Sequence, residues 1–297
     1  MNNVDLHMHS IYSDDGEYSV FELIDMAKAK GMRLMAITDH DIAEANEDAI
    51  TYAKQVGIDY LPGIEISCRH DGVDLHILGY DIDHRNPIWQ QRYKALMADY
   101  QIGIVKVVAL LNDYLKVDID IDRLRAEAGD KPVTGETICA YLLEDESNIE
   151  NPLLRPYFKG GDRSDMPLVN FYWDYMAQGK IAYVDGNFIT SLEDALAMIK
   201  ESNGFAVLAH PGQNLAGKEE MLADIIDAGV IGIEVYTSYH DETQIAYYLK
   251  KAEQFGCLIT GGSDYHGAIK PNIVIGEHHG QIEYDSFVKE LKKRGLR

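Results

Sequence analysis

Six short segments of this chain place histidine or acidic side chains at the end of an apolar run or within one. They are His7-Met8-His9, Asp39-His40, Glu65, His76, His210 and Gly262-Ser263-Asp264-Tyr265-His266. An isolated histidine carries little information, but histidines and carboxylates that recur at strand ends along a chain indicate one shared site for several metal ions. The fold must therefore bring the ends of several strands together.

Strand-like and helix-like segments alternate over roughly the first 80 residues and again after about residue 180. Ser19-Val20-Phe21-Glu22 has the capping-box pattern that begins a helix, and the apolar run 34–37 that follows predicts a buried strand. Later strands are expected over 205–209, 231–235 and 257–260. This alternation predicts parallel strands joined by helical crossovers, with enough units to close a barrel, whose functional side chains lie at the carboxyl ends of the strands.

The middle of the chain has a different pattern. From about residue 86 to 180 the apolar residues follow a helical period, and no ligand-like residue at a strand end occurs there. We therefore predict an α/β barrel domain formed by residues 1–85 and 181–297, with a small helical lid domain, residues 86–180, inserted into it.

Composition excludes several classes of protein. The net charge of -22 argues against double-stranded nucleic acid as a partner, because such binding depends on lysine and arginine contacts to phosphates. The sequence has no run of 18 apolar residues, so no membrane span is expected. The chain begins without the basic and apolar regions of a signal peptide, and its three cysteines are scattered. A cytoplasmic protein is the simplest expectation.

The two segments with i, i+2 spacing can each direct two ligands at one ion. Residues two apart in an extended segment point the same way, so His7 and His9 can face a cation together, as can Asp264 and His266. Two unrelated loop histidines are the alternative for the first pair, and a simple turn is the alternative for the second. The other strand-end residues favour ligands in both places.

Three single residues complete the set. Glu65 follows a strand and has the two oxygens needed to bridge two cations, although a glutamate at a strand end is often only a surface residue. His76 lies inside an apolar run, where a core histidine is a fair alternative, and His210 precedes Pro211-Gly212 at a strand end. Imidazoles and carboxylates without cysteine suit Mn, Fe or Zn, and several such ions together indicate metal-assisted hydrolysis.

These motifs resemble those of the PHP (polymerase and histidinol phosphatase) domain family. The segments that carry the resemblance are His7-Met8-His9-Ser10, Ser13-Asp14-Asp15-Gly16, Thr38-Asp39-His40-Asp41, Gly63-Ile64-Glu65, His76-Ile77-Leu78-Gly79, Ala209-His210-Pro211-Gly212 and Gly262-Ser263-Asp264-Tyr265-His266. Their order and spacing are similar to those of the stand-alone metal-dependent phosphoesterases of this family that have a helical insertion. The resemblance implies a distorted seven-stranded β/α barrel with two to three divalent metal ions.

The resemblance also implies how the ligands are shared. His7, His9, Glu65 and Asp264 would hold the first ion, Glu65 would bridge to a second held by His76 and His210, and His40, His266 and a loop carboxylate would hold a third. Asp14 is our choice for that carboxylate because it follows Ser13 as in the family's S-D-G pattern, with Asp15 as the alternative. Other branches of the family have a histidine in this loop, so an aspartate could weaken the third site and leave two ions.

The implied reaction is attack on phosphorus by a hydroxide that bridges the metals, with Glu65 and Asp264 in the catalytic centre. His240, just after the strand over 231–235, is a candidate proton donor to the leaving group, and a surface histidine is its alternative. Lys180 and Arg155 are candidates for binding a substrate phosphate, although exposed side chains are the default for both.

The substrate is expected to be a small phosphate ester of nucleotide or ribose type, either a monoester or a cyclic diester. Relatives that act on bisphosphates carry an Arg-His pair near the position of Gly135-Glu136. The chain has no cation and an added anion at this position, which argues against a bisphosphate. A metal-dependent amidohydrolase or lactonase is one alternative function, and a non-catalytic PHP module is another.

Overall fold

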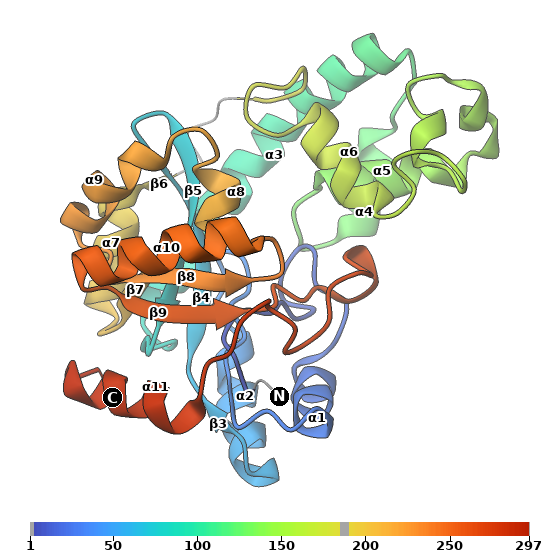
Figure 1. The fold of residues 1–297 in the computed structure, drawn as a ribbon. Helices are drawn as coiled ribbons and strands as arrows, with labels where there is room; N and C mark the ends of the chain where they lie inside the picture. The colour runs from blue at the N-terminus through green and yellow to red at the C-terminus, as the bar shows by residue number, and fades with distance from the viewer. Residues whose placement is uncertain (1–2, 185–189, 297) are drawn as a thin grey trace. The chain divides into compact units, whose positions relative to one another are not determined.

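The computed structural model describes residues 3–184 and 190–296, and the chain divides into two compact units (Figure 1). The first unit comprises residues 1–92, 189–267 and 273–297, and the second comprises residues 93–188 and 268–272. The helical insertion was expected over 86–180. The main segment of the second unit instead begins and ends several residues later, at 93 and 188. Helix α3 (Pro87–Leu115) runs across the first boundary.

The first unit begins with three short parallel strands in the order β1-β2-β3. They are β1 (Val4–Asp5), β2 (Leu34–Met35) and β3 (Asp59–Tyr60), with α1 (Val20–Ala29) and α2 (Ala45–Val56) between them. The predicted capping box is confirmed, because the Ser19 side chain accepts from the Glu22 amide while Glu22 accepts from the Ser19 amide. Gly57 ends α2 in the left-handed conformation that glycine adopts without strain.

A six-stranded sheet forms the rest of this unit, in the order β6-β4-β5-β7-β8-β9. Its strands are β4 (Gly63–His70), β5 (Val73–Tyr80), β6 (Thr190–Ser191), β7 (Phe205–Leu208), β8 (Gly232–Thr237) and β9 (Leu258–Gly262). The prediction of parallel strands throughout is wrong at β5, which is antiparallel to both β4 and β7. Asp71 and Gly72 join β4 to β5 with positive φ at both residues, as a tight hairpin turn requires.

Backbone contacts connect the two sheets at the positions of the ligand motifs. The amide of Leu6 donates to Gly261 and that of Asp264 donates to His7, so the first strand runs beside the last. The amide of Glu65 donates to Asp39, which places the segment after β2 beside β4. The described strands form sheets of three and six strands, so a closed barrel of seven strands stays a prediction.

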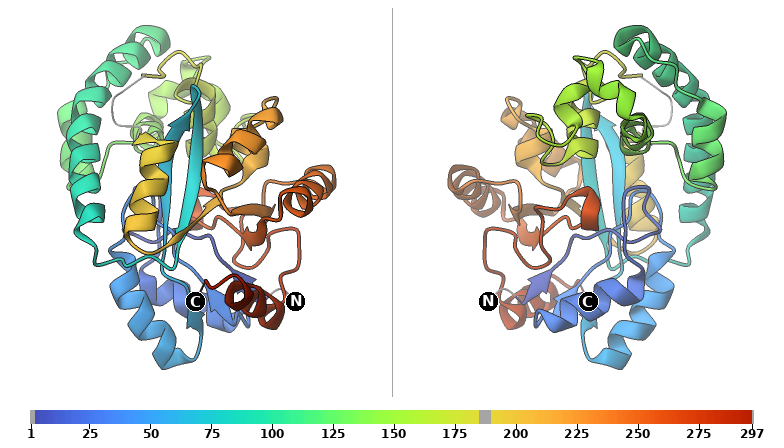
Figure 2. Two further views of the ribbon diagram at one scale, coloured as in Figure 1. Left: turned by 90° about the vertical axis from the view of Figure 1, so that its left-hand side faces the viewer. Right: turned by 90° about the vertical axis from the view of Figure 1, so that its right-hand side faces the viewer.

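Helices of the first unit cover the six-stranded sheet and bury its apolar side chains. They are α7 (Leu192–Glu201), α8 (Pro211–Asn214), α9 (Leu222–Ala228), α10 (Glu242–Phe255) and α11 (Tyr284–Lys293), with a short 3-10 turn at Glu219–Met221. Another 3-10 turn, Gly267–Ile269, crosses a boundary between the two units. Helix α7 lies along β4 and β5, as the side views show (Figure 2), and its Leu192, Ala195 and Ile199 are almost fully buried. This packing fixes the strands whose ends carry the candidate ligands.

The regular elements of the second unit are all helices among its described residues, in agreement with the helical period of the sequence. Its elements are the C-terminal part of α3, α4 (Ile121–Ala128), α5 (Gly135–Glu144) and α6 (Pro167–Tyr175), with 3-10 turns at Glu146–Glu150 and Arg155–Tyr157. Leu111 and Leu115 of α3 are buried in this unit together with Ile138, Leu142 and Phe171. The unit therefore has an apolar core of its own.

Helix α3 is also the one helix among the described residues that is long and apolar enough to cross a membrane, judged by length and composition alone. Core helices of soluble proteins pass the same test. One face of α3 packs into the core of the second unit, while Ile102 on another face is 65% exposed. The expectations of no membrane partner and a cytoplasmic location stay predictions.

The buried Asn46 side chain provides a test of how α2 positions β4. Its amide donates to the carbonyls of Ala43 and Gly63, both at 2.9 Å, and its oxygen accepts from Gly63 N and the Tyr60 hydroxyl. We expect Asn46→Ala to lower the free energy of unfolding by about 2–4 kcal/mol, because several buried polar groups lose their partners. Urea unfolding measures this effect. Gln55→Ala removes an exposed amide from the same helix and should change stability by less than about 0.5 kcal/mol; equal losses would contradict the role given to Asn46.

Candidate metal centre

His7 and His9 lie just beyond β1, with both rings fully buried and turned to the same side. Met8 between them packs in an apolar cluster with Leu23 and Ile37. The alternation of an extended segment therefore places two imidazoles in one site and a thioether in the core. The structure brings His7 and His9 together as the i, i+2 spacing predicts.

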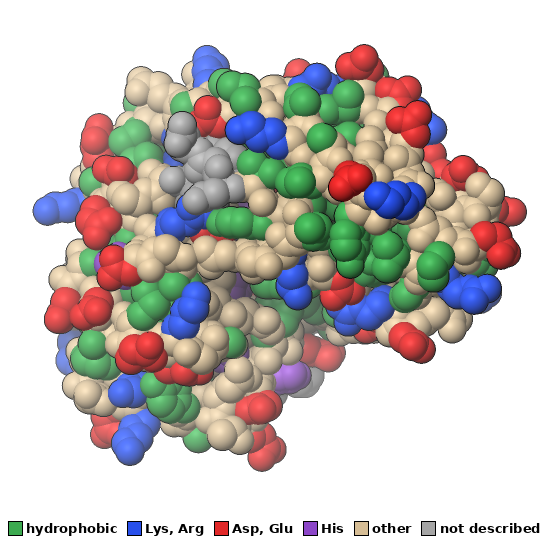
Figure 3. All heavy atoms as spheres, turned by 90° about the horizontal axis from the view of Figure 1, so that it is seen from above, with side chains coloured by type: hydrophobic (Ala, Val, Ile, Leu, Met, Phe, Trp, Pro, Cys, Tyr) green, Lys and Arg blue, Asp and Glu red, His purple; other side chains and the backbone are tan. Residues whose placement is uncertain are grey.

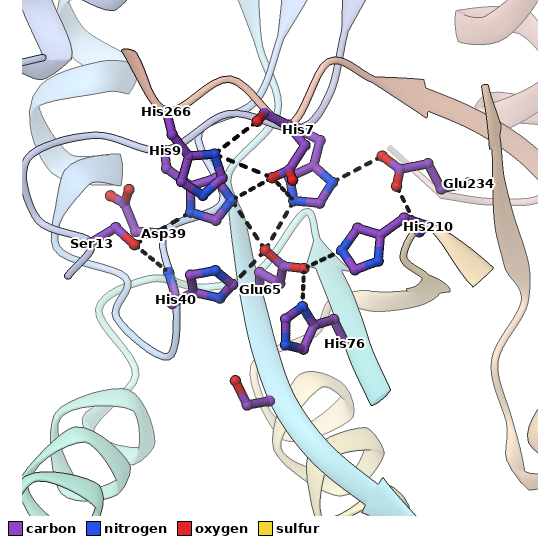
Figure 4. Close-up of polar contacts among 12 residues, drawn as sticks. His7, His9, Ser13, Asp39, His40, Glu65, His76, His210, Glu234 and His266 are labelled. Atoms are coloured by element: carbon purple, nitrogen blue, oxygen red, sulfur yellow. Dashed lines mark hydrogen bonds and ion pairs between the residues drawn. The ribbon is translucent and has the colours of Figure 1, made fainter. Parts of the chain in front are cut away.

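The Glu65 carboxylate lies at the centre of the site (Figure 4). Its Oε2 atom is 2.9 Å from His7 Nε2, 3.1 Å from His9 Nε2 and 3.4 Å from His40 Nδ1. Its Oε1 atom is 2.9 Å from His76 Nδ1 and 3.0 Å from His210 Nε2. Each oxygen of this buried carboxylate therefore faces a different set of imidazoles.

Asp264 and His266 approach the same histidines from the segment after β9. Asp264 Oδ1 lies 3.2 Å from His7 Nε2 and 3.1 Å from His9 Nε2, and the Tyr239 hydroxyl donates to its other oxygen. The His266 ring is buried and stacks on His9 at a centroid distance of 4.0 Å. The last strand therefore adds a carboxylate and an imidazole to the pair supplied by the first.

Asp15, rather than Asp14, is the loop carboxylate that the structure brings into the cluster. Asp15 Oδ2 lies 2.9 Å from His266 Nε2 and 3.6 Å from His40 Nε2. The Ser13 hydroxyl is 2.8 Å from Asp15 Oδ1 and 3.4 Å from Asp14 Oδ1. The choice of Asp14 from the S-D-G pattern therefore differs from the geometry, because Ser13 and the loop direct the second aspartate inward.

Three overlapping groups of potential ligand atoms result, each with its atoms within 4.8 Å of one another. They are His7, His9, Glu65 and Asp264; His40, Glu65 and His76; and His9, Asp15, His40 and His266. His210 adjoins the second group through Glu65. All the predicted ligands except Asp14 and His210 belong to these groups, and His210 lies 3.0 Å from Glu65 Oε1.

The hydrogen-bonding pattern fits a set of lone pairs directed at cations. Among the described residues, His9 Nε2, His40 Nδ1 and His76 Nδ1 are buried and make no hydrogen bond, although each lies within 3.4 Å of a Glu65 oxygen. Nitrogen and oxygen atoms that approach this closely without hydrogen-bond geometry fit the arrangement of ligands around a shared ion. Neutral imidazole and ionised carboxylate are also the donor set of Mn, Fe and Zn sites.

The electrostatics of the cluster keep its carboxylates ionised. Burial alone would raise the pKa of Glu65, but nearby His7, His40 and His76 hold it well below its usual range. The pKa of Asp15 is likewise held low, against burial, by His266 and His40. Burial lowers the pKa of His40 to about 3, which favours the neutral ring that a metal binds.

His9 differs from His40 in the balance of these effects. Burial alone would lower its pKa, but the carboxylates of Asp264, Glu65 and Asp15 raise it to about 10. The negative charge collected around His9 is thus large enough to outweigh complete burial of the ring. A divalent cation would neutralise the same charge.

Two buried carboxylates near the ligands, Asp5 and Glu234, were not singled out as site residues from the sequence, and Asp39 was named only as part of the Asp39-His40 segment. Asp39 accepts from the amide and hydroxyl of Ser10, at 2.5 and 2.7 Å, so it faces Ser10, and burial raises its pKa to about 6. Glu234 accepts from the His210 amide and lies 2.9 Å from His7 Nδ1. Asp5 accepts from the amides of Ser263 and Gly276. Asp5 and Glu234 could have been found from the sequence, because each is an acidic residue within an apolar strand.

His240 is buried beside the site, but both of its ring nitrogens are engaged with the backbone. Nδ1 lies 2.9 Å from the Val235 carbonyl, and Nε2 accepts from the Gly212 amide at 2.9 Å. Burial also lowers the pKa of this ring, so the neutral form is favoured. These contacts leave no ring N–H for a leaving group, and they argue against the predicted role of proton donor. Lys180 and Arg155 are exposed side chains of the second unit.

Comparison with known proteins assigns the class to which this fold and site belong. The family model of the PHP domain matches residues 5–151. The chain therefore contains a PHP domain.

Three curated relatives match the chain over most of its length. A 3′,5′-nucleoside bisphosphate phosphatase from Chromobacterium violaceum is 29% identical, over 90% of this chain and 88% of the relative. A 5′-3′ exoribonuclease from Haemophilus influenzae is 28% identical, over 88% and 89%. A phosphoribosyl 1,2-cyclic phosphate 1,2-diphosphodiesterase from Eggerthella lenta is 27% identical, over 89% and 94%.

A solved structure from Chromobacterium violaceum, described as an amidohydrolase with bound sulfate and no metal, has a TM-score of 0.76 at 25% identity. The match covers 98% of this chain and 96% of the solved chain. Similarity over nearly the whole length of both chains extends the comparison beyond residues 5–151 to the second unit and the C-terminal segment.

The two loop aspartates allow a direct test of which one is a ligand. We expect Asp15→Asn to lower the manganese content of the loaded protein by about one ion per chain, because it weakens the group with His40 and His266. Asp14→Asn should leave the content unchanged. Elemental analysis after loading and gel filtration measures both variants. If Asp14→Asn lowered the manganese content and Asp15→Asn did not, Asp14 would be the ligand.

Proposed function

We propose that this chain is a metal-dependent phosphoesterase that hydrolyses a small phosphate ester of nucleotide or ribose type. The observation that carries the proposal is the buried Glu65 carboxylate, each oxygen of which faces a different set of histidines. Three relatives that span most of the chain, a bisphosphate phosphatase, an exoribonuclease and a cyclic phosphate diphosphodiesterase, all act on phosphoester bonds. The backbone contacts between the two sheets support a closed seven-stranded barrel around this site.

The residues would divide among two to three divalent ions of Mn, Fe or Zn. His7, His9, Glu65 and Asp264 would hold one ion, and Glu65, His76 and His210 a second. Asp15, His40 and His266 would hold the third. Ions in these places would lower the pKa of water and neutralise charge that develops on the phosphoryl oxygens.

The protein's own contribution is to hold ionised carboxylates and imidazole rings in a fixed arrangement. Glu65 is fully buried and surrounded by five histidine rings, so its position is set by the fold before a substrate arrives. Asp264 is fixed by Tyr239 on one oxygen, which turns the other toward His7 and His9. Preorganised charge of this kind needs little rearrangement during reaction.

The surroundings of Gly135 bear on whether this chain could carry the Arg-His pair of the relatives that act on bisphosphates. Gly135 begins α5, and a Cβ atom there would lie 3.0 Å from Met176 Sδ and 3.1 Å from Tyr172 Cβ. The packing of α5 against α6 therefore has no room for an arginine at this position without a shift. This supports a monoester or cyclic diester rather than a bisphosphate bound as in relatives with the Arg-His pair.

Charge on the surface bears on larger partners. On the face drawn in Figure 3, acidic and basic side chains of the described residues are interspersed, without a continuous basic stripe. A net charge of -22 with this distribution disfavours double-stranded nucleic acid. A short RNA end is a small enough substrate to remain compatible with both observations.

The central test is hydrolysis of a panel of phosphate esters by manganese-loaded protein. We expect phosphate or phosphomonoester release that EDTA abolishes and added Mn²⁺ restores. Glu65→Gln should lower kcat/KM by about 10³-fold, because the bridge between two ions is worth several kcal/mol. Glu253→Gln removes the same charge from an exposed position on α10 and should leave the rate unchanged.

The same panel separates the alternatives. Amide and lactone substrates run in parallel test the amidohydrolase function, for which the description of the Chromobacterium violaceum structure gives a reason. Loaded protein that turned over only these substrates would replace the proposal with that alternative. A loaded protein inactive on every substrate would favour a non-catalytic module.

We also propose that Lys180 and Arg155 bind a phosphate of the substrate. Lys180→Ala and Arg155→Ala should each raise KM by about tenfold with little change in kcat, the effect of losing a charged hydrogen bond made equally in ground and transition states. Lys116→Ala, at another exposed lysine of the second unit, is the control. Steady-state kinetics on the best panel substrate measures all three variants. An unchanged KM would remove the residue concerned from the binding site.

A further inference from the structure

Glu234 lies inside β8 with no exposed surface, and both of its carboxylate oxygens are engaged by the candidate metal centre. Oε1 is 2.9 Å from His7 Nδ1, and Oε2 accepts from the backbone amide of His210 at 2.8 Å. In Figure 4, Glu234 lies on the side of His7 that faces away from Glu65. It touches two predicted ligands but does not belong to any of the three groups of ligand atoms.

The contact between Glu234 and His7 determines which tautomer and orientation the His7 ring adopts. A carboxylate oxygen can only accept, so the hydrogen of the neutral ring lies on Nδ1. The lone pair is then on Nε2, the atom 2.9 Å from Glu65 Oε2 and 3.2 Å from Asp264 Oδ1. Glu234 therefore selects both the tautomer and the orientation of His7 that a metal ion requires.

The contact with His210 constrains its backbone. His210 has φ of 23°, an unfavourable value for a residue with a side chain, and its amide is held by Glu234. Its ring reaches Glu65 Oε1 at 3.0 Å, whereas His7 reaches Oε2. The two residues held by Glu234 thus face opposite oxygens of Glu65.

We propose that Glu234 is a positioning residue that sets His7 and His210 for the two ions that Glu65 would bridge. This inference rests on the proposed function and extends it to a residue beyond the ligands. Only a carboxylate suits the position, because it accepts from two donors at once through two oxygens. Glutamine offers one oxygen and one NH₂ group, so Glu234→Gln must set a donor against either the His7 Nδ1–H or the His210 amide.

The test is the affinity of the folded protein for Mn²⁺, followed from free Mn²⁺ by electron paramagnetic resonance in the absence of substrate. We expect Glu234→Gln to raise the dissociation constant of the tightest ions by about 10–100-fold, the range typical of losing a partner of a metal-bound histidine. Glu253→Gln, on the exposed face of α10, should stay within about twofold of the natural protein. A folded Glu234→Gln protein with natural affinity would overturn the proposal.

A second variant and a second readout separate positioning from a purely structural role. Glu234→Asp keeps the charge but is one methylene shorter, so it cannot reach both donors, and its dissociation constant should also rise. Circular dichroism and thermal unfolding in EDTA report the fold without metal. Lower thermal stability with unchanged Mn²⁺ affinity would assign Glu234 to structure alone, as would loss of the fold in both variants.

The outcome does not depend on turnover, because Mn²⁺ affinity is measured without a phosphate ester. A natural protein that binds Mn²⁺ but hydrolyses no ester would refute the proposed function and leave the role of Glu234 to be decided by the affinities. An active natural protein whose Glu234 variants bind Mn²⁺ normally would refute only the positioning role.

Discussion

A buried carboxylate among histidine rings is the interaction on which the arrangement of this site depends. Glu65 has no exposed surface, and its two oxygens lie within 3.4 Å of five imidazole nitrogens. Burying an ionised carboxylate is costly unless charge and hydrogen-bond donors compensate it closely. The histidines supply that compensation in the metal-free chain, and cations would supply it more strongly.

The ligands could be predicted from the sequence because their geometry follows from local rules. Alternation in an extended segment places His7 beside His9, and the segment just after β9 brings Asp264 and His266 against His9. The helix beginning at Ser19 was predictable for a similar reason, since a capping box is a local pattern. Features set within a few residues can be derived from the chain alone.

The errors concern features that depend on distant partners or on turn geometry. Asp14 and Asp15 are adjacent, and which one faces His266 is decided by the turn at Ser13, not by residue type. The antiparallel direction of β5 had a local signal in Asp71-Gly72, a pair typical of hairpin turns, but the strand–helix alternation elsewhere outweighed it. His240 follows a strand end as a ligand would, yet its ring nitrogens are engaged by the backbone of Val235 and Gly212.

The ligand set can exist only after the two ends of the chain have met. The amide of Asp264 donates to the His7 carbonyl, and the amide of Leu6 to Gly261, so the first cation group forms only when the first and last strands lie together. An ion that binds this arrangement has little affinity for the unfolded chain, and it adds about 2.7 kcal/mol of stability at a free concentration 100 times its dissociation constant. His210 and Asp264 both have positive φ, which costs on the order of 1–3 kcal/mol for each such residue. Ion binding would offset that strain, so the candidate metal centre would stabilise the fold as well as be the proposed place of its chemistry.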